Sequence, residues 1–411
     1  MSWAAVKVNG TRGPGTACGD AGRYGRRAPQ RAGTASGIDL MDRREFVARV
    51  GRFGAGACLA CAGGQVWAAV PRGELQRDVD FYESLSGNRV RCGVCPRRCV
   101  RGEGETGFCR TRINLGGRWF ARIYGNPCVL RIDSIEKMPL NHFRPASQTM
   151  TIGSGGCNLH CLYCQNWEQA LSPLEELKTF DLSPAEAVEA AGKRGIDTIA
   201  FNYTGLIAAL EYAKDVARAA RRAELKVVAA TGAYVEPEPL LDLAQYVDAF
   251  VISLKGYTEE FYRQVVAGTL DPVLKAIKAV KNQTDCWLEL VNLVVPTYND
   301  DLRGIRRMCG WIRREVGVTT PVHFARFVPM YRLTNLPRTP VQTLERACEI
   351  ARQVGLRHVY TSNIAPHEGS NTYCDKCGAA VIQRLGFRVL ENKLVDGRCP
   401  KCHRRLPGVW A

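Results

Sequence analysis

The stretch QTMTIGSGGCNLHCLYCQNW, at residues 148–167, joins a predicted strand to a loop with three closely spaced cysteines. These are Cys157, Cys161 and Cys164, in a C-x3-C-x2-C spacing. A closed tetrahedral metal site needs four ligands. The loop therefore either takes a fourth ligand from elsewhere in the chain or leaves one metal position open.

Strand and helix patterns alternate along the chain after this stretch. The predicted strands are 148–153, 198–202, 226–231, 248–254, 287–295, 321–328 and 357–362, and the predicted helices are 183–194, 206–223, 237–245, 258–267, 271–283, 300–315 and 341–354. Such alternation predicts βα units and a parallel sheet. We expect an α/β fold with a partial (β/α)6-type barrel, whose ligands gather at the C-terminal ends of the strands. The three cysteines follow the first of these ends.

The composition indicates a globular protein with metal sites. The 411 residues are 46% apolar, enough for one large domain with appendages or for two domains. The net charge of +16 suits an anionic partner, such as nucleic acid, an acidic protein or a membrane surface, and identifies none of them. Eleven of the 18 cysteines fall into three compact groups, which in a chain of this size indicates metal sites made in a reducing compartment and excludes a small disulfide scaffold.

Two further cysteine groups are closed sets of four. The first is Cys92, Cys95, Cys99 and Cys109, in a C-x2-C-x3-C-x9-C spacing. Four thiolates suit zinc or a second 4Fe–4S cluster, and the spacing leaves both open.

The second closed set lies near the C-terminus. It consists of Cys374, Cys377, Cys399 and Cys402, in a C-x2-C-x21-C-x2-C spacing. Two such pairs around a strand-rich spacer predict a zinc ribbon. His403 follows the last cysteine and is not needed, because four thiolates already complete a tetrahedron.

The three-cysteine loop allows three kinds of site. Structural zinc would need a fourth ligand, and His160 has little freedom to supply it between Cys157 and Cys161. A redox C-x2-C pair would leave Cys157 unexplained. A 4Fe–4S cluster held by three thiolates leaves one iron open to bind a substrate or cofactor directly.

The loop resembles the signature of radical S-adenosylmethionine (SAM) enzymes, including the aromatic Tyr163 before the last cysteine. Other motifs follow in order and extend the likeness over residues 85–410: CGVCPRRCVRGEGETGFCRTR, PLNHFRP, GYTEEFY, HFARFVPMYRLTNLPRTPVQTLERA, HEGSNTYCDKCG and CPKCHRRLPGVW. Together they resemble the radical SAM enzyme of the AmmeMemoRadiSam system, a relative of pyruvate formate-lyase activating enzymes.

The resemblance implies that SAM binds the open iron and is cleaved reductively. The resulting 5′-deoxyadenosyl radical would abstract hydrogen from an unidentified substrate, with the radical chemistry supplied by the cofactor. The family pattern implies that Tyr163, Gly205 and Thr231 lie near SAM. It also implies a low-potential electron donor and Memo-type and AMMECR1-type partner proteins.

Two turns depart from the family pattern. Relatives carry an Asn-Glu-Pro-like turn after the second strand, where residues 204–206 here read Thr-Gly-Leu. Relatives have Thr-Asn-Gly-Tyr after the third strand, where residues 231–234 read Thr-Gly-Ala-Tyr. The missing glutamate removes a carboxylate partner for the SAM ammonium, so we expect weaker or altered SAM binding.

Four functional classes remain open at this level. One is hydrogen abstraction from a substrate that the sequence does not identify, and another is activation of a glycyl-radical enzyme. The third is modification of an RNA base. The fourth is a non-catalytic iron–sulfur and zinc binding module that no longer cleaves SAM.

The expected organisation has five segments. Residues 1–40 form a disordered or untranslated extension, and 41–70 form a twin-arginine-like leader with Arg43 and Arg44 before an apolar stretch. The remaining segments are the four-cysteine module with its connection (71–147), the barrel (148–366) and the ribbon (367–411). We expect no membrane span beyond the leader. Because SAM and low-potential donors are cytoplasmic, we favour cytoplasmic function, although the leader leaves export open.

Three polar residues near predicted strand ends are further candidates. Lys255 ends the fourth strand, and His323 and Arg326 lie on the sixth. Each could face a substrate cavity, and a role in the core or in a salt bridge fits equally well. His367 and Glu368, after the last strand, could close the mouth of the barrel.

Overall fold

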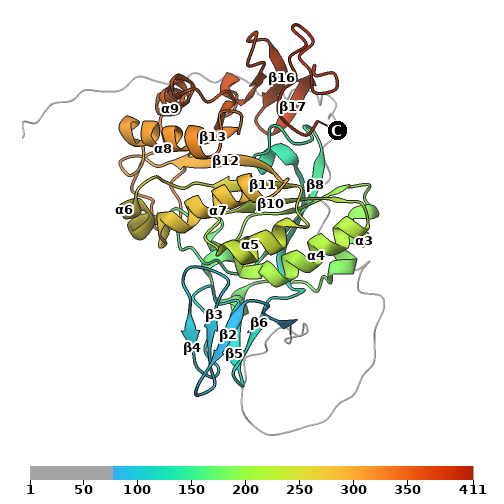
Figure 1. The fold of residues 1–411 in the computed structure, drawn as a ribbon, viewed down its shortest axis with the longest axis vertical. Helices are drawn as coiled ribbons and strands as arrows, with labels where there is room; N and C mark the ends of the chain where they lie inside the picture. Colours follow the sequence, from blue (N-terminus) through green and yellow to red (C-terminus); the bar gives the residue numbers. More distant parts are fainter. Residues whose placement is uncertain (1–76, 411) are drawn as a thin grey trace, which may run out of the picture. The chain divides into compact units, whose positions relative to one another are not determined.

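Eight strands form the central sheet of the structure, a computed structural model that describes residues 77–410 (Figure 1). In spatial order they are β14 (Val359–Ser362), β13 (Val322–Arg326), β12 (Trp287–Val294), β11 (Ala249–Ser253), β10 (Lys226–Thr231), β9 (Thr198–Phe201), β8 (Gln148–Ser154) and β7 (Pro127–Ser134). Strands β8 to β14 pair in parallel with their sequence neighbours. The predicted α/β architecture is confirmed, and the predicted extension (1–40) and leader (41–70) lie outside the described residues.

Strand β7 was not predicted from the sequence. It pairs antiparallel with β8 over most of its length and extends the edge of the sheet. Its burial pattern is largely intermediate and includes exposed positions. A strand without a continuous apolar run or strict alternation gives little signal in the sequence.

The helices that connect the parallel strands lie along the sheet (Figure 1). They are α3 (Pro184–Gly192), α4 (Leu210–Arg222), α5 (Pro237–Ala244), α7 (Leu270–Gln283), α8 (Leu302–Glu315) and α9 (Val341–Val354). Local sequence sets their starts. Ser183 and Glu186 form a capping box at α3, and the Asp301 side chain accepts a hydrogen bond from the Gly304 backbone at α8.

The helix predicted at 258–267 is different in the structure. A single helical turn, α6 (Glu259–Phe261), leads into a π-helical turn, η4 (Tyr262–Val266). Ala267 then ends the turn in the left-handed region, at φ 56°. π-helical turns are rare and often occur at functional sites.

Alternate residues of the buried strands face opposite sides of the sheet. Ile199 and Val227 pack in the core beneath the helices. Their neighbours Ala200 and Val228 face the other side, where residues 135–143 cover them with apolar side chains. The segment that contains the PLNHFRP motif therefore closes the inner face of the sheet.

A buried polar network surrounds this segment. The Glu289 carboxylate accepts hydrogen bonds from the backbone N–H groups of Asn141 and His142, and it lies 2.7 Å from His323 Nε2. Burial alone would raise the pKa of Glu289, but its partners, first His323, hold it at about 2. His323, a candidate for a substrate cavity, is fully buried in this network.

Two small sheets make up the N-terminal module. One has the order β1 (Arg77–Asp78), β6 (Arg118–Ala121) and β5 (Arg112–Leu115), and the other β2 (Tyr82–Leu85), β3 (Arg89–Cys92) and β4 (Val100–Arg101). The described residues all belong to one compact unit, Trp67–Ala411.

The C-terminal module is a three-stranded antiparallel sheet of β15 (Thr372–Tyr373), β16 (Ala380–Leu385) and β17 (Arg388–Asn392). Its buried Arg384 guanidinium donates to the Asn141 carbonyl at 2.8 Å, and the Val409 N–H donates to the His142 carbonyl. These bonds join the module to the segment that closes the sheet. Among residues 77–410, no helix has the length and apolar character needed to cross a membrane.

Candidate functional site

The three-cysteine loop starts two residues after β8 and is fixed by backbone hydrogen bonds. The His160 and Leu162 N–H groups donate to the carbonyls of Val266 and Val265, at 3.1 and 2.9 Å. These carbonyls belong to the π-helical turn after β11. The turn therefore holds the loop across the C-terminal edge of the sheet, where ligands of such folds bind.

The thiols of the loop lie in a largely apolar environment. Burial, with a smaller contribution from Cys161, raises the pKa of Cys157 to about 12, and burial raises that of Cys164 to about 11. The Cys161 thiol is 7% exposed, and burial raises its pKa as well. Metal binding requires thiolates, so a metal group must displace these protons when it enters.

The distances between the cysteine sulfurs distinguish a site for an iron–sulfur cluster from a site for a single metal ion. In a tetrahedral zinc site with Zn–S bonds of about 2.3 Å, the sulfurs lie about 3.8 Å apart. Within residues 77–410, the ligand group whose atoms all lie within 4.8 Å of one another is Cys374, Cys377, Cys399 and Cys402, and the three-cysteine loop forms no such group. Wider spacing suits a 4Fe–4S cluster, because each thiolate binds a different iron.

Gly205 lies against Cys157. A Cβ atom at this position would be 2.7 Å from Cys157 Cα and 2.8 Å from its Sγ. The Gly205 N–H also donates to the Gly156 carbonyl at 3.2 Å. The turn after β9 therefore has no room for a side chain at position 205, which gives a physical reason for its departure from an acidic turn.

Lys255 brings a positive charge to the loop. Its ammonium lies 6.0 Å from the centre of the Tyr163 ring, and its charge opposes the rise in pKa of all three thiols. Within the described part of the chain this ammonium has no carboxylate partner. A free cation beside the cysteines can bind an anionic group of a ligand.

Tyr163 and Thr231, the other predicted SAM contacts, are both buried. The Tyr163 hydroxyl has no hydrogen-bond partner among the described residues, and burial with nearby Cys161 raises its pKa. The Thr231 hydroxyl accepts from the Ala233 N–H at 3.0 Å. Tyr163 adjoins the cysteines directly, whereas Thr231 shapes the turn after β10.

The N-terminal module contacts the same loop through a stack of side chains. The Arg97 guanidinium lies 3.4 Å from the Phe108 ring centre, and Phe108 stacks on His160 at 4.1 Å. Arg97 also donates to the Asn158 carbonyl at 2.8 Å and to the Ala267 carbonyl. His160 therefore takes part in this stack, and burial lowers its pKa to about 4.

The four C-terminal cysteines have the geometry of a single-metal site. Burial would raise the pKa of Cys399, but the backbone N–H of Cys402 and neighbouring donors lower it to about 7. Such N–H donors stabilise thiolates. Cys374 and Cys402 have sulfurs 3.5 Å apart, close to the separation that one tetrahedral ion requires.

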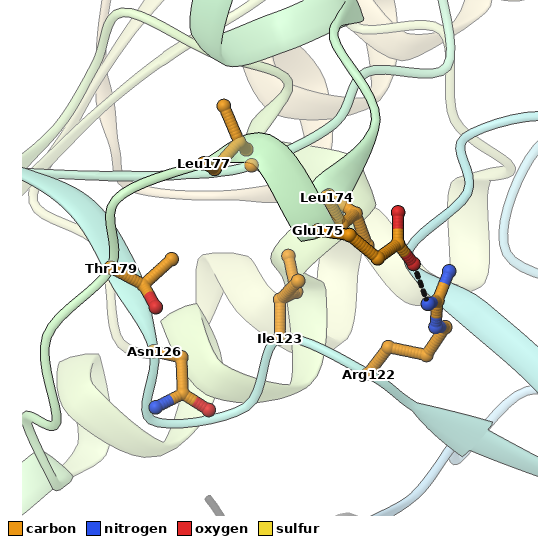
Figure 2. A pocket seen from close by; sticks show the side chains of 8 residues that line it. Arg122, Ile123, Asn126, Leu174, Glu175, Leu177 and Thr179 are labelled. Carbon is orange, nitrogen blue, oxygen red and sulfur yellow. Dashed lines mark hydrogen bonds and ion pairs between the residues drawn. The ribbon is translucent and has the colours of Figure 1, made fainter. Parts of the chain in front are cut away.

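Two surface pockets differ in their distance along the chain from this loop, and the first is lined in part by Gly155, two residues before Cys157. One cavity, of about 20 Å³, is lined by Ile123, Leu174 and Leu177 beside an Arg122–Glu175 ion pair (Figure 2). It has room for little more than one water molecule. Another, of about 210 Å³, lies between α8 and α9. Neither is lined by a cysteine.

Several residues of the site gave no local signal in the sequence. Arg112 and Glu211, both buried, form a bidentate ion pair between β5 and α4, with N–O distances of 2.9 Å. Arg112 also donates to Cys109 Sγ at 3.8 Å. Their separation along the chain hides this pair from pattern analysis. His367 contacts Thr361 and Glu345, which fix its ring on the last strand and α9.

Comparison with known proteins gives one family and one long relative. The family model described as the Radical SAM superfamily matches residues 151–309. An uncharacterized protein of Methanocaldococcus jannaschii is 41% identical over 332 residues, which cover 80% of this chain and 98% of that protein.

Two solved structures resemble parts of the chain. A domain of pyruvate-formate lyase-activating enzyme from Bacteroides vulgatus is 12% identical, covers 38% of this chain and 91% of its own, and has a TM-score of 0.34. A radical SAM methyltransferase from Sphaerobacter thermophilus is 16% identical, with coverage of 54% and 68% and a TM-score of 0.43.

Proposed function

The chain belongs to the radical SAM superfamily, and on that premise we propose that Cys157, Cys161 and Cys164 bind a 4Fe–4S cluster with one iron open for SAM. When bound, these groups supply one-electron cleavage of SAM to methionine and a 5′-deoxyadenosyl radical that abstracts hydrogen. The observation that carries the proposal is the position of the three thiols. They follow β8 at the C-terminal edge of the sheet and, unlike the four ribbon cysteines, do not form a group whose ligand atoms all lie within 4.8 Å of one another.

The residues around the loop have separate roles in this proposal. Lys255 binds the SAM carboxylate, because its ammonium has no carboxylate partner among residues 77–410 and lies near Tyr163 and the cysteines. Gly205 keeps the space beside Cys157 clear, Tyr163 excludes water, and Thr231 holds the turn after β10. Since residues 204–206 bring no carboxylate, backbone carbonyls bind the SAM ammonium, and SAM binding is weaker than with a glutamate.

The target class is an activase-like oxidoreductase reaction on a partner protein. The ordered motifs that resemble the AmmeMemoRadiSam enzyme support it, and Memo-type or AMMECR1-type proteins are the partners to test. RNA modification is a second candidate, favoured by the net charge of +16. We propose that the ribbon binds zinc and that the protein works in the cytoplasm, where SAM and low-potential donors are available.

An anaerobic assay tests the central proposal. The reconstituted, reduced protein should convert SAM to 5′-deoxyadenosine and methionine, measured by liquid chromatography and mass spectrometry. Cys161→Ala should lose the cluster and both products while it keeps the ribbon metal. Cys348→Ala removes a buried thiol remote from the loop. This variant should keep the cluster, the formation of both products and the ribbon metal.

The outcome also separates the functional classes. A fully assembled cluster without SAM cleavage would support the non-catalytic module and refute the enzyme. Deuterium transferred from a labelled partner protein, or from labelled RNA, into 5′-deoxyadenosine would identify the substrate class. Cell fractionation with an antibody to this chain tests the location.

A further inference from the structure

We propose that Cys92, Cys95, Cys99 and Cys109 bind a second iron–sulfur cluster, which passes single electrons from an external donor to the three-cysteine loop. The inference rests on the proposed SAM chemistry for its purpose. Its metal assignment is independent of that chemistry. The sequence left zinc and a cluster equally open at this module, and three structural observations favour the cluster.

The first observation is the spacing of the sulfurs. The same chain carries two closed sets of four cysteines, and they differ. The ribbon sulfurs gather within 4.8 Å, as one tetrahedral ion requires, whereas the N-terminal four form no such set among the residues that the structure describes. In this respect the N-terminal set resembles the three-cysteine loop.

The second observation is a set of donors aimed at the sulfurs. Cys109 Sγ accepts from Arg112 at 3.8 Å, and Cys99 Sγ accepts from the Phe108 N–H at 3.5 Å. The Thr111 hydroxyl lies 3.1 Å from Cys109 Sγ and donates to the Ala208 carbonyl at 2.6 Å. The indole N–H of Trp119 is buried without a partner among the described residues and adjoins Cys92. Hydrogen bonds to sulfur tune the reduction potential of a cluster.

The third observation is contact with the radical site. Gly156, the residue before Cys157, packs on the N-terminal group so closely that a Cβ there would lie 2.7 Å from the Cys109 carbonyl oxygen and 2.3 Å from Thr111 Cγ2. Its φ of 83° also favours glycine. One non-bonded contact therefore separates Cys109 from the backbone of the three-cysteine loop.

The burial of the four cysteines indicates where an external electron donor can approach the second cluster. Cys92, Cys95 and Cys109 are buried, whereas Cys99 is half-buried between exposed Arg98 and Val100. An external donor would approach at Cys99. For each SAM cleaved, a reduced low-potential flavin or iron–sulfur protein loses one electron, the second cluster gains and then loses it, and SAM gains it.

Metal analysis of the full chain tests the assignment. After anaerobic reconstitution with ferrous iron and sulfide, the wild type should hold about eight iron atoms and one zinc, since each cubane contains about four irons. Cys95→Ser and Cys99→Ser should each lose about half of the iron and none of the zinc. About four irons and two zincs in the wild type, with zinc lost in Cys95→Ser, would overturn the proposal.

Controls keep the result independent of folding and of the proposed function. Cys348→Ser should retain the full metal content, and unchanged ribbon zinc with a cooperative thermal unfolding transition in Cys99→Ser shows that the chain has folded. Cys161→Ser should keep the second cluster. If Cys161→Ser loses no iron while Cys95→Ser loses all of it, the SAM-cluster proposal fails and the present assignment stands.

Two further measurements test the relay. In electron paramagnetic resonance, the reduced wild type should show signals broadened by coupling between adjacent clusters, and each single-cluster variant should show a sharp signal. In Cys99→Ser, 5′-deoxyadenosine formation should fall at least tenfold with reduced flavodoxin and persist with dithionite. Uncoupled signals, or equal rates with both reductants, would overturn the relay.

Discussion

Replacement of Gly205 by alanine tests whether close packing on Cys157 fixes the cluster loop. The backbone at Gly205 has φ −76° and ψ 90°, which other residues adopt freely, so the substitution adds no backbone strain. Its effect comes from the new methyl group alone. That methyl would lie 2.7 Å from Cys157 Cα and 2.8 Å from Sγ.

The expected magnitude follows from these distances. Ordinary carbon contacts lie at about 3.5–4.0 Å, so the two loops must separate by about 1 Å. Overpacking of this kind costs about 1–3 kcal/mol in the free energy of unfolding. Metal ligands tolerate displacements of about 0.2 Å, so the shift of Cys157 should also weaken cluster binding strongly.

Three measurements on one variant check this reasoning: urea unfolding, iron content and ribbon metal content. Gly205→Ala should lose stability and most of the iron at the three-cysteine loop, and it should keep the ribbon metal. Gly192→Ala is the matched control, because a Cβ at the end of α3 would meet nothing within 4 Å. The reasoning is wrong if Gly205→Ala retains full iron content and an unchanged urea midpoint.

Three other perturbations give distinct results. Arg112→Met leaves Glu211 buried and unpaired, so the free energy of unfolding measured in urea should fall by about 3–5 kcal/mol. Adding Glu211→Gln to this variant should recover part of the lost stability, and no recovery would contradict a buried ion pair. Burial, with nearby His358, lowers the pKa of His142 to about 3, and burial lowers that of His358 to about 4, both from 6.5. Between pH 6.5 and about 4 the unfolded chain therefore binds more protons than the folded chain. In this window the unfolding free energy should fall by up to about 1.4 kcal/mol per histidine for each pH unit, measured by urea titration at several pH values, and a flat profile would exclude this. Cys377→Ser should release the ribbon metal and leave the iron in place, as metal analysis can show, and simultaneous loss of iron would contradict separate sites.

Local patterns in the sequence determined the core of the fold. Seven parallel strands match predicted apolar segments, because a strand buried on both faces needs a continuous apolar run. The three cysteine groups were also visible, since ligands on one loop or one pair of turns have characteristic spacings. The position of the three-cysteine loop at the C-terminal edge of the sheet followed from its place after the first parallel strand.

Only the tertiary structure decided which of these groups meet. Cys109 and Gly156 come into contact although 46 residues separate them, counted from their residue numbers. Arg112 on β5 forms an ion pair with Glu211 on α4, and the Glu289 carboxylate accepts a hydrogen bond from Asn141, within the segment 135–143. Such contacts depend on how packed elements approach one another in space. Local periodicity and spacing describe single elements, so they cannot reveal that Gly205 must be small or that two cysteine groups are neighbours.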